Sequence, residues 1–161
     1  MAGAPEPFRN IHGTALAVGG KGALIRGPSG SGKSDLALRC LYLGRSQLSS
    51  EPVQLIADDQ ILVHRDGPHV LLSSPGSIVG LIEVRGIGIV GTPSAPTVPL
   101  MLVVDLVPTS EPISRLPEPE TVIIDGVAIA RIRLHPFEQS AAIKLLLALS
   151  LQGKTTWQNA L

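Results

Sequence analysis

Residues 27–34 read GPSGSGKS, and this short stretch constrains the fold more than any other part of the chain. Its spacing, Gly27, four residues, then Gly32, Lys33 and Ser34, is that of a loop whose backbone N–H groups surround a phosphate. Such a loop lies between a strand and a helix, because the helix N-terminus presents free N–H groups and a positive dipole end. The flanking segments GALIR and SDLALRCL fit those two elements. We therefore expect an α/β core built around this loop.

Each residue type in the loop has a mechanical reason to be there. The glycines let backbone amides turn inward without a clash from side chains. Lys33 is expected to reach the outer phosphates of a nucleotide, and the Ser34 hydroxyl is expected to bind Mg²⁺. The alternative, a glycine-rich turn without a ligand, is disfavoured because the whole pattern and both flanking elements agree. The candidate nucleotide-binding residues are Gly27, Pro28, Ser29, Gly30, Ser31, Gly32, Lys33 and Ser34.

Apolar patterning elsewhere predicts many strands but few helices. A regular doubly wound fold follows each strand with its own helix, so the pattern instead favours a mixed, strand-rich sheet around the helix after the loop. At 161 residues the chain is expected to form one domain, residues 1–161, with its proline-rich stretches as surface connections. The predicted strands are 15–18, 23–26, 53–57, 61–64, 70–72, 81–84, 100–106, 122–124 and 127–134, and the predicted helices are 33–44, ending at Gly44, and 136–151.

Composition excludes several partners. Thirteen basic residues balance thirteen acidic ones, so no net field attracts nucleic acid or an anionic membrane, and aromatic residues for base stacking make up only 2%. The most apolar stretch, 143–151, is far shorter than the roughly 20 residues that span a bilayer. The single cysteine, Cys40, lies among leucines and is expected to be a buried thiol. With no secretory signal in MAGAPEPFRN, we expect a cytoplasmic protein.

Phosphoryl transfer needs a carboxylate to hold metal and, in a kinase, a base beside the acceptor hydroxyl. Three apolar runs end in aspartate: at Asp58 and Asp59, at Asp105, and at Asp125. The strand pattern alone does not separate them. Adjacent carboxylates repel, so the doublet at 58–59 is unfavourable unless a cation or a chemical role stabilises it. The doublet is therefore the preferred candidate, with two solvated carboxylates opening a turn as the alternative.

A second unusual stretch is GLIEVRGIGIVG, residues 80–91. Glu83 and Arg85 are two apart in a strand-like run and are expected to share a face. The glycines at 86, 88 and 91 are expected to let the backbone pass close to something else. The charged pair has two equally good interpretations. It could serve a metal and a phosphate, or it could form a surface salt bridge on an edge strand.

Together these segments resemble the catalytic domain of the bacterial HPr kinase/phosphorylase family. The likeness runs through IHG at 11–13, GPSGSGKSDLAL at 27–38, LIADD at 55–59 and LIEVRGIGIV at 81–90. The resemblance implies a phosphate-loop α/β fold like that domain and the nucleotide-binding part of phosphoenolpyruvate carboxykinase. It also implies an enzyme that uses ATP and Mg²⁺ to phosphorylate a serine of HPr, the small carrier of the sugar phosphotransferase system. The reverse reaction would use inorganic phosphate and release pyrophosphate.

The resemblance also implies roles for individual residues. Lys33 would hold the outer phosphates, and Ser34 and Glu83 would hold the magnesium ion. Asp59, backed by Asp58, would accept the proton of the substrate serine. The remaining catalytic candidates are His12, which would line the site near Asp59, and Arg85, which would serve both reactions.

The sequence departs from the family in three places. It resembles a short form without an N-terminal domain, and its connection GRSQLSSEPVQ is longer than usual. Where the family has an arginine- and glycine-bearing loop, this chain reads RIRLHPFEQSAA, so Arg131 or Arg133 is the candidate replacement for that arginine. Family members form hexamers, so a homo-oligomer is implied. The rival functions are a small-molecule kinase with the same loop and a nucleotide-sensing module without chemistry.

Overall fold

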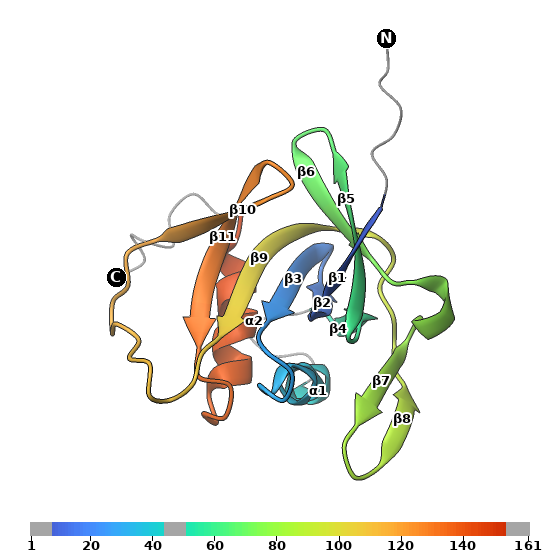
Figure 1. The fold of residues 1–161 in the computed structure, drawn as a ribbon, viewed down its shortest axis with the longest axis horizontal. Coiled ribbons are helices and arrows are strands. Elements are labelled where there is room, and N and C mark those ends of the chain that lie inside the picture. Colours follow the sequence, from blue (N-terminus) through green and yellow to red (C-terminus); the bar gives the residue numbers. More distant parts are fainter. Residues whose placement is uncertain (1–7, 44–50, 154–161) are drawn as a thin grey trace.

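The computed structural model describes residues 8–43 and 51–153, which form a strand-rich α/β fold (Figure 1). The strands are β1 (Arg9–His12), β2 (Thr14–Val18), β3 (Lys21–Arg26), β4 (Val53–Ala57), β5 (Gln60–Asp66), β6 (His69–Ser73), β7 (Leu81–Val84), β8 (Gly88–Gly91), β9 (Val98–Leu106), β10 (Glu120–Ile124) and β11 (Val127–Leu134). The helices are α1 (Lys33–Leu43) and α2 (Ala141–Leu151), with one 3₁₀ turn at Gly76–Ile78.

One nine-stranded mixed sheet forms the centre of the molecule, in the order β1-β5-β6-β9-β3-β2-β4, with β11 and then β10 added beside β9. The long strand β9 pairs in parallel with both β3 and β11, whereas the other neighbours in this sheet are antiparallel. Because β3, β9 and β11 are parallel, their carboxyl ends meet at one edge of the sheet. The predicted mixed sheet is confirmed.

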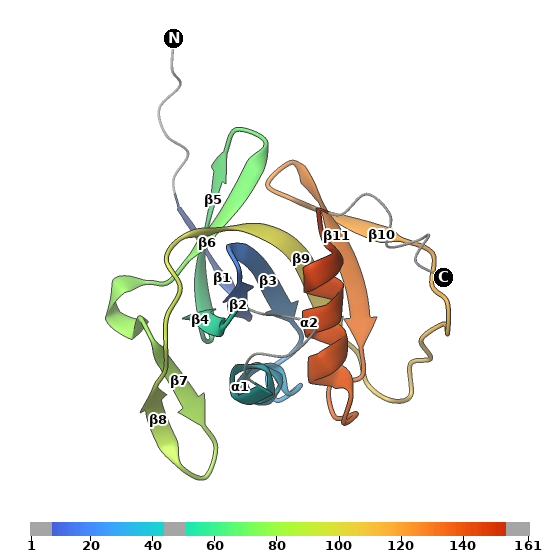
Figure 2. The same ribbon diagram turned by 180° about the vertical axis from the view of Figure 1, so that it is seen from behind.

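Side chains that alternate along the central strands fill a core on each face of the sheet. Ile25 and Val104 belong to a core that includes residues of both helices, which cover the face seen in Figure 2. Their neighbours Leu24 and Val103 belong to a second core that includes residues of β5, β6, β10 and β11. Cys40 of α1 lies fully buried in the first core, and burial raises the pKa of its thiol to about 12, as expected for an inert structural cysteine.

The strands β7 and β8 form a separate antiparallel hairpin that projects beside α1 (Figure 1). Ile82 fixes the hairpin to the body, because it is buried in the core that contains α1, whereas Ile87 and Ile89 near its end are exposed. The hairpin therefore reaches out next to the helix that follows the phosphate loop.

The structure differs from the sequence prediction chiefly in two added strands and in the start of the second helix, and several other strands begin or end a few residues away from their predicted bounds. Neither β1 nor β8 was predicted, and α2 begins at Ala141 instead of residue 136 because residues 136–140 form turns before it. The predicted helix stop at Gly44 and most of the connection GRSQLSSEPVQ lie outside the described residues. In the described ranges, no helix is both long and apolar enough to cross a membrane.

Candidate active site

The phosphate loop follows β3 at the edge where the parallel strands end, and α1 begins at Lys33 directly behind it. Gly32 has φ +99°, a conformation that side chains rarely allow, and a Cβ at this position would lie 3.1 Å from the Phe137 ring. The Leu36 amide donates to the Gly32 carbonyl at 2.9 Å, so the first helical turn starts inside the motif. The backbone amides of the loop consequently lie at the N-terminal end of a helix, and this arrangement favours the binding of an anion there.

Lys33 is largely buried, and its ammonium group lies over the loop. Its Nζ donates to the carbonyl oxygens of Gly27 and Pro28 at 2.8 and 2.9 Å. Both acceptors are neutral, so the positive charge of Lys33 has no acidic partner in these bonds. The charge remains available for the oxygens of a bound phosphate.

Asp58 ends the β4 segment and is only 8% exposed. One carboxylate oxygen accepts from the Ser34 hydroxyl at 2.7 Å and from the Thr14 hydroxyl at 3.0 Å, and the other accepts from the Glu83 amide at 3.2 Å. All three donors are neutral. A nearly buried carboxylate therefore lies against the hydroxyl of the loop serine with its charge unneutralised by these contacts, which favours a cation beside it.

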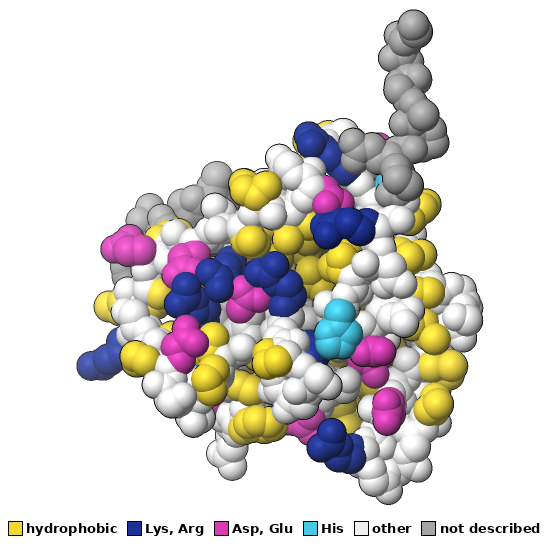
Figure 3. All heavy atoms as spheres, in the orientation of Figure 1, with side chains coloured by type: hydrophobic (Ala, Val, Ile, Leu, Met, Phe, Trp, Pro, Cys, Tyr) yellow, Lys and Arg dark blue, Asp and Glu magenta, His cyan; other side chains and the backbone are white. Residues whose placement is uncertain are grey.

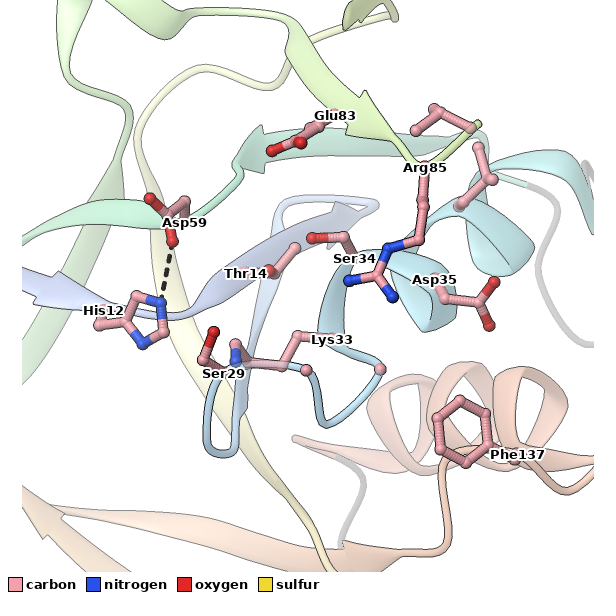
Figure 4. A pocket seen from close by; sticks show the side chains of 14 residues that line it. His12, Thr14, Ser29, Lys33, Ser34, Asp35, Asp59, Glu83, Arg85 and Phe137 are labelled. Carbon is pink, nitrogen blue, oxygen red and sulfur yellow. Dashed lines mark hydrogen bonds and ion pairs between the residues drawn. The ribbon is translucent and has the colours of Figure 1, made fainter. Parts of the chain in front are cut away.

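Asp59, the next residue, faces another partner. Its backbone has φ +70°, in the left-handed region that aspartate tolerates better than most residues, at the tight connection between β4 and β5. Its exposed carboxylate lies 2.8 Å from Nε2 of His12 (Figure 4), and its carbonyl accepts from the Gly13 amide at 3.1 Å. The doublet thus presents one buried and one open carboxylate.

The hairpin brings Glu83 and Arg85 to the same pocket from the opposite side (Figure 4). We expected Arg85 to lie in the strand, but β7 ends at Val84 and Arg85 lies in the turn that follows. Among the described residues, Glu83 and Arg85 form no ion pair with each other. The expected close approach at the hairpin glycines is also wrong for the described residues, since nothing lies within 4 Å of a Cβ built at Gly86, Gly88 or Gly91. Gly86 and Gly88 instead adopt the positive φ values of the turn.

A pocket of about 430 Å³ joins these groups. It brings together most of the residues singled out in the sequence, and Asp58 lies directly behind it through its bond to Ser34. The sequence prediction missed Thr14, Asp35, Leu38, Val84 and Phe137. The available signals were a threonine that opens an apolar strand and a rare aromatic residue in the segment that departs from the family. The lining residues are His12, Thr14, Ser29, Gly30, Gly32, Lys33, Ser34, Asp35, Leu38, Asp59, Glu83, Val84, Arg85 and Phe137.

The oxygen donors in this pocket and directly behind it fit a magnesium ion. Mg²⁺ is usually bound by one or two carboxylates together with phosphate oxygens and water. Ser34, Asp58 and Glu83 provide a hydroxyl and two carboxylates next to the loop, and the direct bond from Ser34 to Asp58 shows that two of these donors already meet. The predicted metal ligands Ser34 and Glu83, together with Asp58, therefore form a set of oxygen donors that suits Mg²⁺.

The other two candidate aspartates lie elsewhere. Asp105, at the end of β9, is hydrogen-bonded by Arg26 at 2.8 and 2.9 Å and by Arg131 at 2.5 Å. Burial alone would raise the pKa of Asp105, but the hydrogen bonds from Arg26 and Arg131 outweigh it and hold the pKa below its usual value. Asp125 pairs with Arg9 at 2.7 Å. Neither carboxylate lines the pocket.

Arginine and acidic side chains alternate on the face of the sheet shown in Figure 3, over β9 and β11. Arg131 pairs with Asp105 and Glu120, and Arg133 lies 3.5 Å from Glu111 and 3.6 Å from Glu120. Neither Arg131 nor Arg133 lines the pocket, and both face acidic side chains of the sheet instead.

Comparison with known proteins agrees with this geometry. The HPr kinase/phosphorylase of Clostridium botulinum (strain Eklund 17B / Type B) is 38% identical over 84 residues, 52% of this chain and 25% of the relative. That of Chlorobium phaeobacteroides (strain BS1) is 33% identical over 89 residues, 55% of this chain and 24% of the relative. The chain thus spans about a quarter of the length of these relatives.

The structural match extends further along the chain. A solved structure of the Hpr(Ser) kinase/phosphatase from Coxiella burnetii superposes with a TM-score of 0.73 and 26% identity, covering 87% of this chain and 93% of that chain. The family model of the HPr serine kinase C-terminal domain matches residues 6–95, which is more than half of the 161 residues. On this match, together with the shared fold, the chain belongs to the HPr serine kinase C-terminal domain family.

Proposed function

We propose that the protein is an ATP- and Mg²⁺-dependent kinase that phosphorylates a serine of an HPr-type phosphocarrier protein. The observation that carries the proposal is a single pocket in which the phosphate loop faces both an open carboxylate, Asp59, and a hairpin carboxylate, Glu83. The names of the relatives, HPr kinase/phosphorylase and Hpr(Ser) kinase/phosphatase, support the same reaction and acceptor.

The loop end of the pocket would bind the nucleotide. The amides of the loop and the Lys33 ammonium surround the phosphates, because both supply positive charge at the start of α1. Ser34, Asp58 and Glu83 would hold the magnesium ion, which neutralises charge on the phosphate oxygens when bound. Catalysis at this end is therefore mainly positioning and electrostatic stabilisation.

Asp59 is the better candidate for the base. Asp58 already accepts from two hydroxyls and an amide, whereas Asp59 is open to the pocket and its carboxylate bonds only to His12 among the residues that the structure describes. In the proposed step the serine oxygen forms a bond to the terminal phosphorus, the bond from phosphorus to the leaving ADP breaks, and the serine proton moves to Asp59. His12 would orient that carboxylate through the 2.8 Å contact.

The proposal includes the reverse direction and the wider setting of the family. An oxygen of inorganic phosphate would form a bond to the phosphorus of the phosphoserine, and the bond from that phosphorus to the serine oxygen would break. Protonated Asp59 would give its proton to the serine oxygen, so the products would be serine and pyrophosphate. We further propose a cytoplasmic homo-oligomer, with a hexamer as the form implied by the family, acting without nucleic acid or membrane partners.

Incubation of the purified protein with an HPr protein and MgATP, followed by mass spectrometry, tests the proposal. We expect one phosphoserine on HPr, none without Mg²⁺, and loss of transfer in Lys33→Ala while the circular dichroism spectrum is retained. A panel of small metabolites runs in parallel. Transfer to a metabolite in place of HPr would identify a small-molecule kinase, and tight ATP binding without any acceptor would identify a nucleotide sensor.

A further inference from the structure

Phe137 is an unusual residue for its position. The chain has only two phenylalanines, one tyrosine and one tryptophan, yet Phe137 is 68% exposed and lines the pocket of the phosphate loop. The edge of its ring lies 3.1 Å from where a Cβ on Gly32 would stand. What sets this ring apart is its place beside the phosphate loop, where it is open to contact with a flat apolar group of a ligand.

The turn that carries Phe137 is held against the helix of the phosphate loop. Arg39 of α1 donates to the carbonyl oxygen of Pro136 and, at 3.2 Å, to that of Glu138, the residues on either side of Phe137. Asp35, one turn earlier, accepts from Arg39 at 3.0 Å. These bonds hold the backbone on both sides of Phe137 against α1, so the turn keeps this residue beside the loop.

The two ends of the pocket have different chemistry (Figure 4). His12 and Asp59 lie at one end, where the terminal phosphate would be transferred, and Phe137 lies at the opposite end. A nucleotide whose phosphates follow the loop toward α1 must extend its base away from Asp59. Asp35 and Arg85 lie on the same side of the pocket as Phe137 (Figure 4).

We propose that Phe137 is the stacking platform for the base of the nucleoside triphosphate, a role that rests on the proposed function. The flat ring matches the face of a purine, and Leu38 adds apolar surface to the lining of the same pocket. Stacking on an aromatic side chain is insensitive to the hydrogen-bonding edge of the base. The site therefore selects a nucleotide over a bare polyphosphate, with little discrimination between adenine and guanine by this residue.

Calorimetric titration with MgATP and with magnesium tripolyphosphate tests this role, because only the former has a base. Phe137→Ala should weaken MgATP binding by about 5- to 100-fold and leave tripolyphosphate binding unchanged. Phe137→Tyr should retain the wild-type preference for MgATP, whereas Phe137→Leu, which keeps an apolar side chain but has no ring, should lose most of it. Phe8→Ala is the matched control, since Phe8 is 59% exposed and lies outside the pocket.

The outcomes separate this role from the nucleotide site itself. Equal weakening of both ligands by Phe137→Ala would mean that the ring only supports the loop, and unchanged MgATP binding would remove its role entirely. Either result overturns the inference. If the wild-type protein bound neither MgATP nor tripolyphosphate, the proposed phosphate site would be overturned instead.

Discussion

Asp58 and Asp105 both follow apolar strands, and both are nearly buried, at 8% and 9% exposed. Their partners differ in charge. Asp58 is surrounded by two hydroxyls and an amide, whereas Asp105 is held between the guanidinium groups of Arg26 and Arg131. The first carboxylate keeps an uncompensated charge beside the phosphate loop, and the second is neutralised within the fold. Equal burial thus produces a candidate cation site in one place and a structural ion pair in the other.

The order of the strands alone would point to Asp105, and not Asp58, as the metal-binding aspartate. Strand β9 is the parallel neighbour of β3, and proteins with this loop often place a metal-binding aspartate on such a strand. In this chain Asp105 shares the side-chain face of Val103, which belongs to the core away from the helices. Asp58 arrives instead from the antiparallel side of the sheet, where Ser34 meets it.

The largest change in activity is expected from a substitution of Asp59, the exposed aspartate of the doublet at 58–59. Asp59→Asn should lower the rate of phosphoserine formation by about 10²- to 10⁴-fold, because a positioned base is lost, with MgATP affinity and melting temperature nearly unchanged. Mass spectrometry of HPr and calorimetry measure these quantities. Wild-type turnover by this variant would refute the assigned base, and Asp125→Asn, outside the pocket, is the control expected to remain active.

A smaller loss is expected at Asp58. Asp58→Asn keeps the shape but removes the charge, so the Mg²⁺ concentration for half-maximal turnover should rise by about 10- to 100-fold. The measurement is a magnesium titration at saturating ATP. If Asp105→Asn shifted the titration as far as Asp58→Asn does, the distinction between the two carboxylates would fail.

Stability should respond in the opposite order. Asp105→Ala leaves Arg26 and Arg131 without their shared partner and should lower the free energy of unfolding by about 3 kcal/mol, whereas Asp58→Ala should cost about 1–2 kcal/mol through lost neutral hydrogen bonds. Urea unfolding followed by circular dichroism gives both values. A greater loss in Asp58→Ala would reverse our ranking of the two sites.

The smallest effect is the pH dependence of that ion pair. Because the pKa of Asp105 is lowered on folding, its stabilisation is present above the unfolded pKa of about 3.9 and is lost as the pH falls through the folded value. The difference in unfolding free energy between wild type and Asp105→Asn should therefore be constant near neutral pH and narrow below about pH 4. A constant difference down to pH 2 would contradict the lowered pKa.

Two strands and the start of the second helix could not be predicted from the sequence pattern, for physical reasons. Strand β1 reads RNIH and is mostly exposed, so it shows no apolar alternation and depends on its pairing with β5. Strand β8 contains two glycines, which are poor strand formers, and forms through the hairpin. The late start of α2 follows from turns at residues 136–140 that are tied to α1 by Arg39. Each depends on a partner distant in sequence.

The amino-acid sequence by itself determined the phosphate loop with its flanking strand and helix, because local spacing and glycine chemistry act over a few residues. It also supplied the doublet at 58–59 and the hairpin carboxylate, Glu83. Only the tertiary structure decided which of three similar strand-ending aspartates faces the loop, since that depends on strand order and on side-chain direction across the sheet. The same packing placed Phe137, just over a hundred residues after α1 begins at Lys33, at the end of the pocket opposite His12 and Asp59.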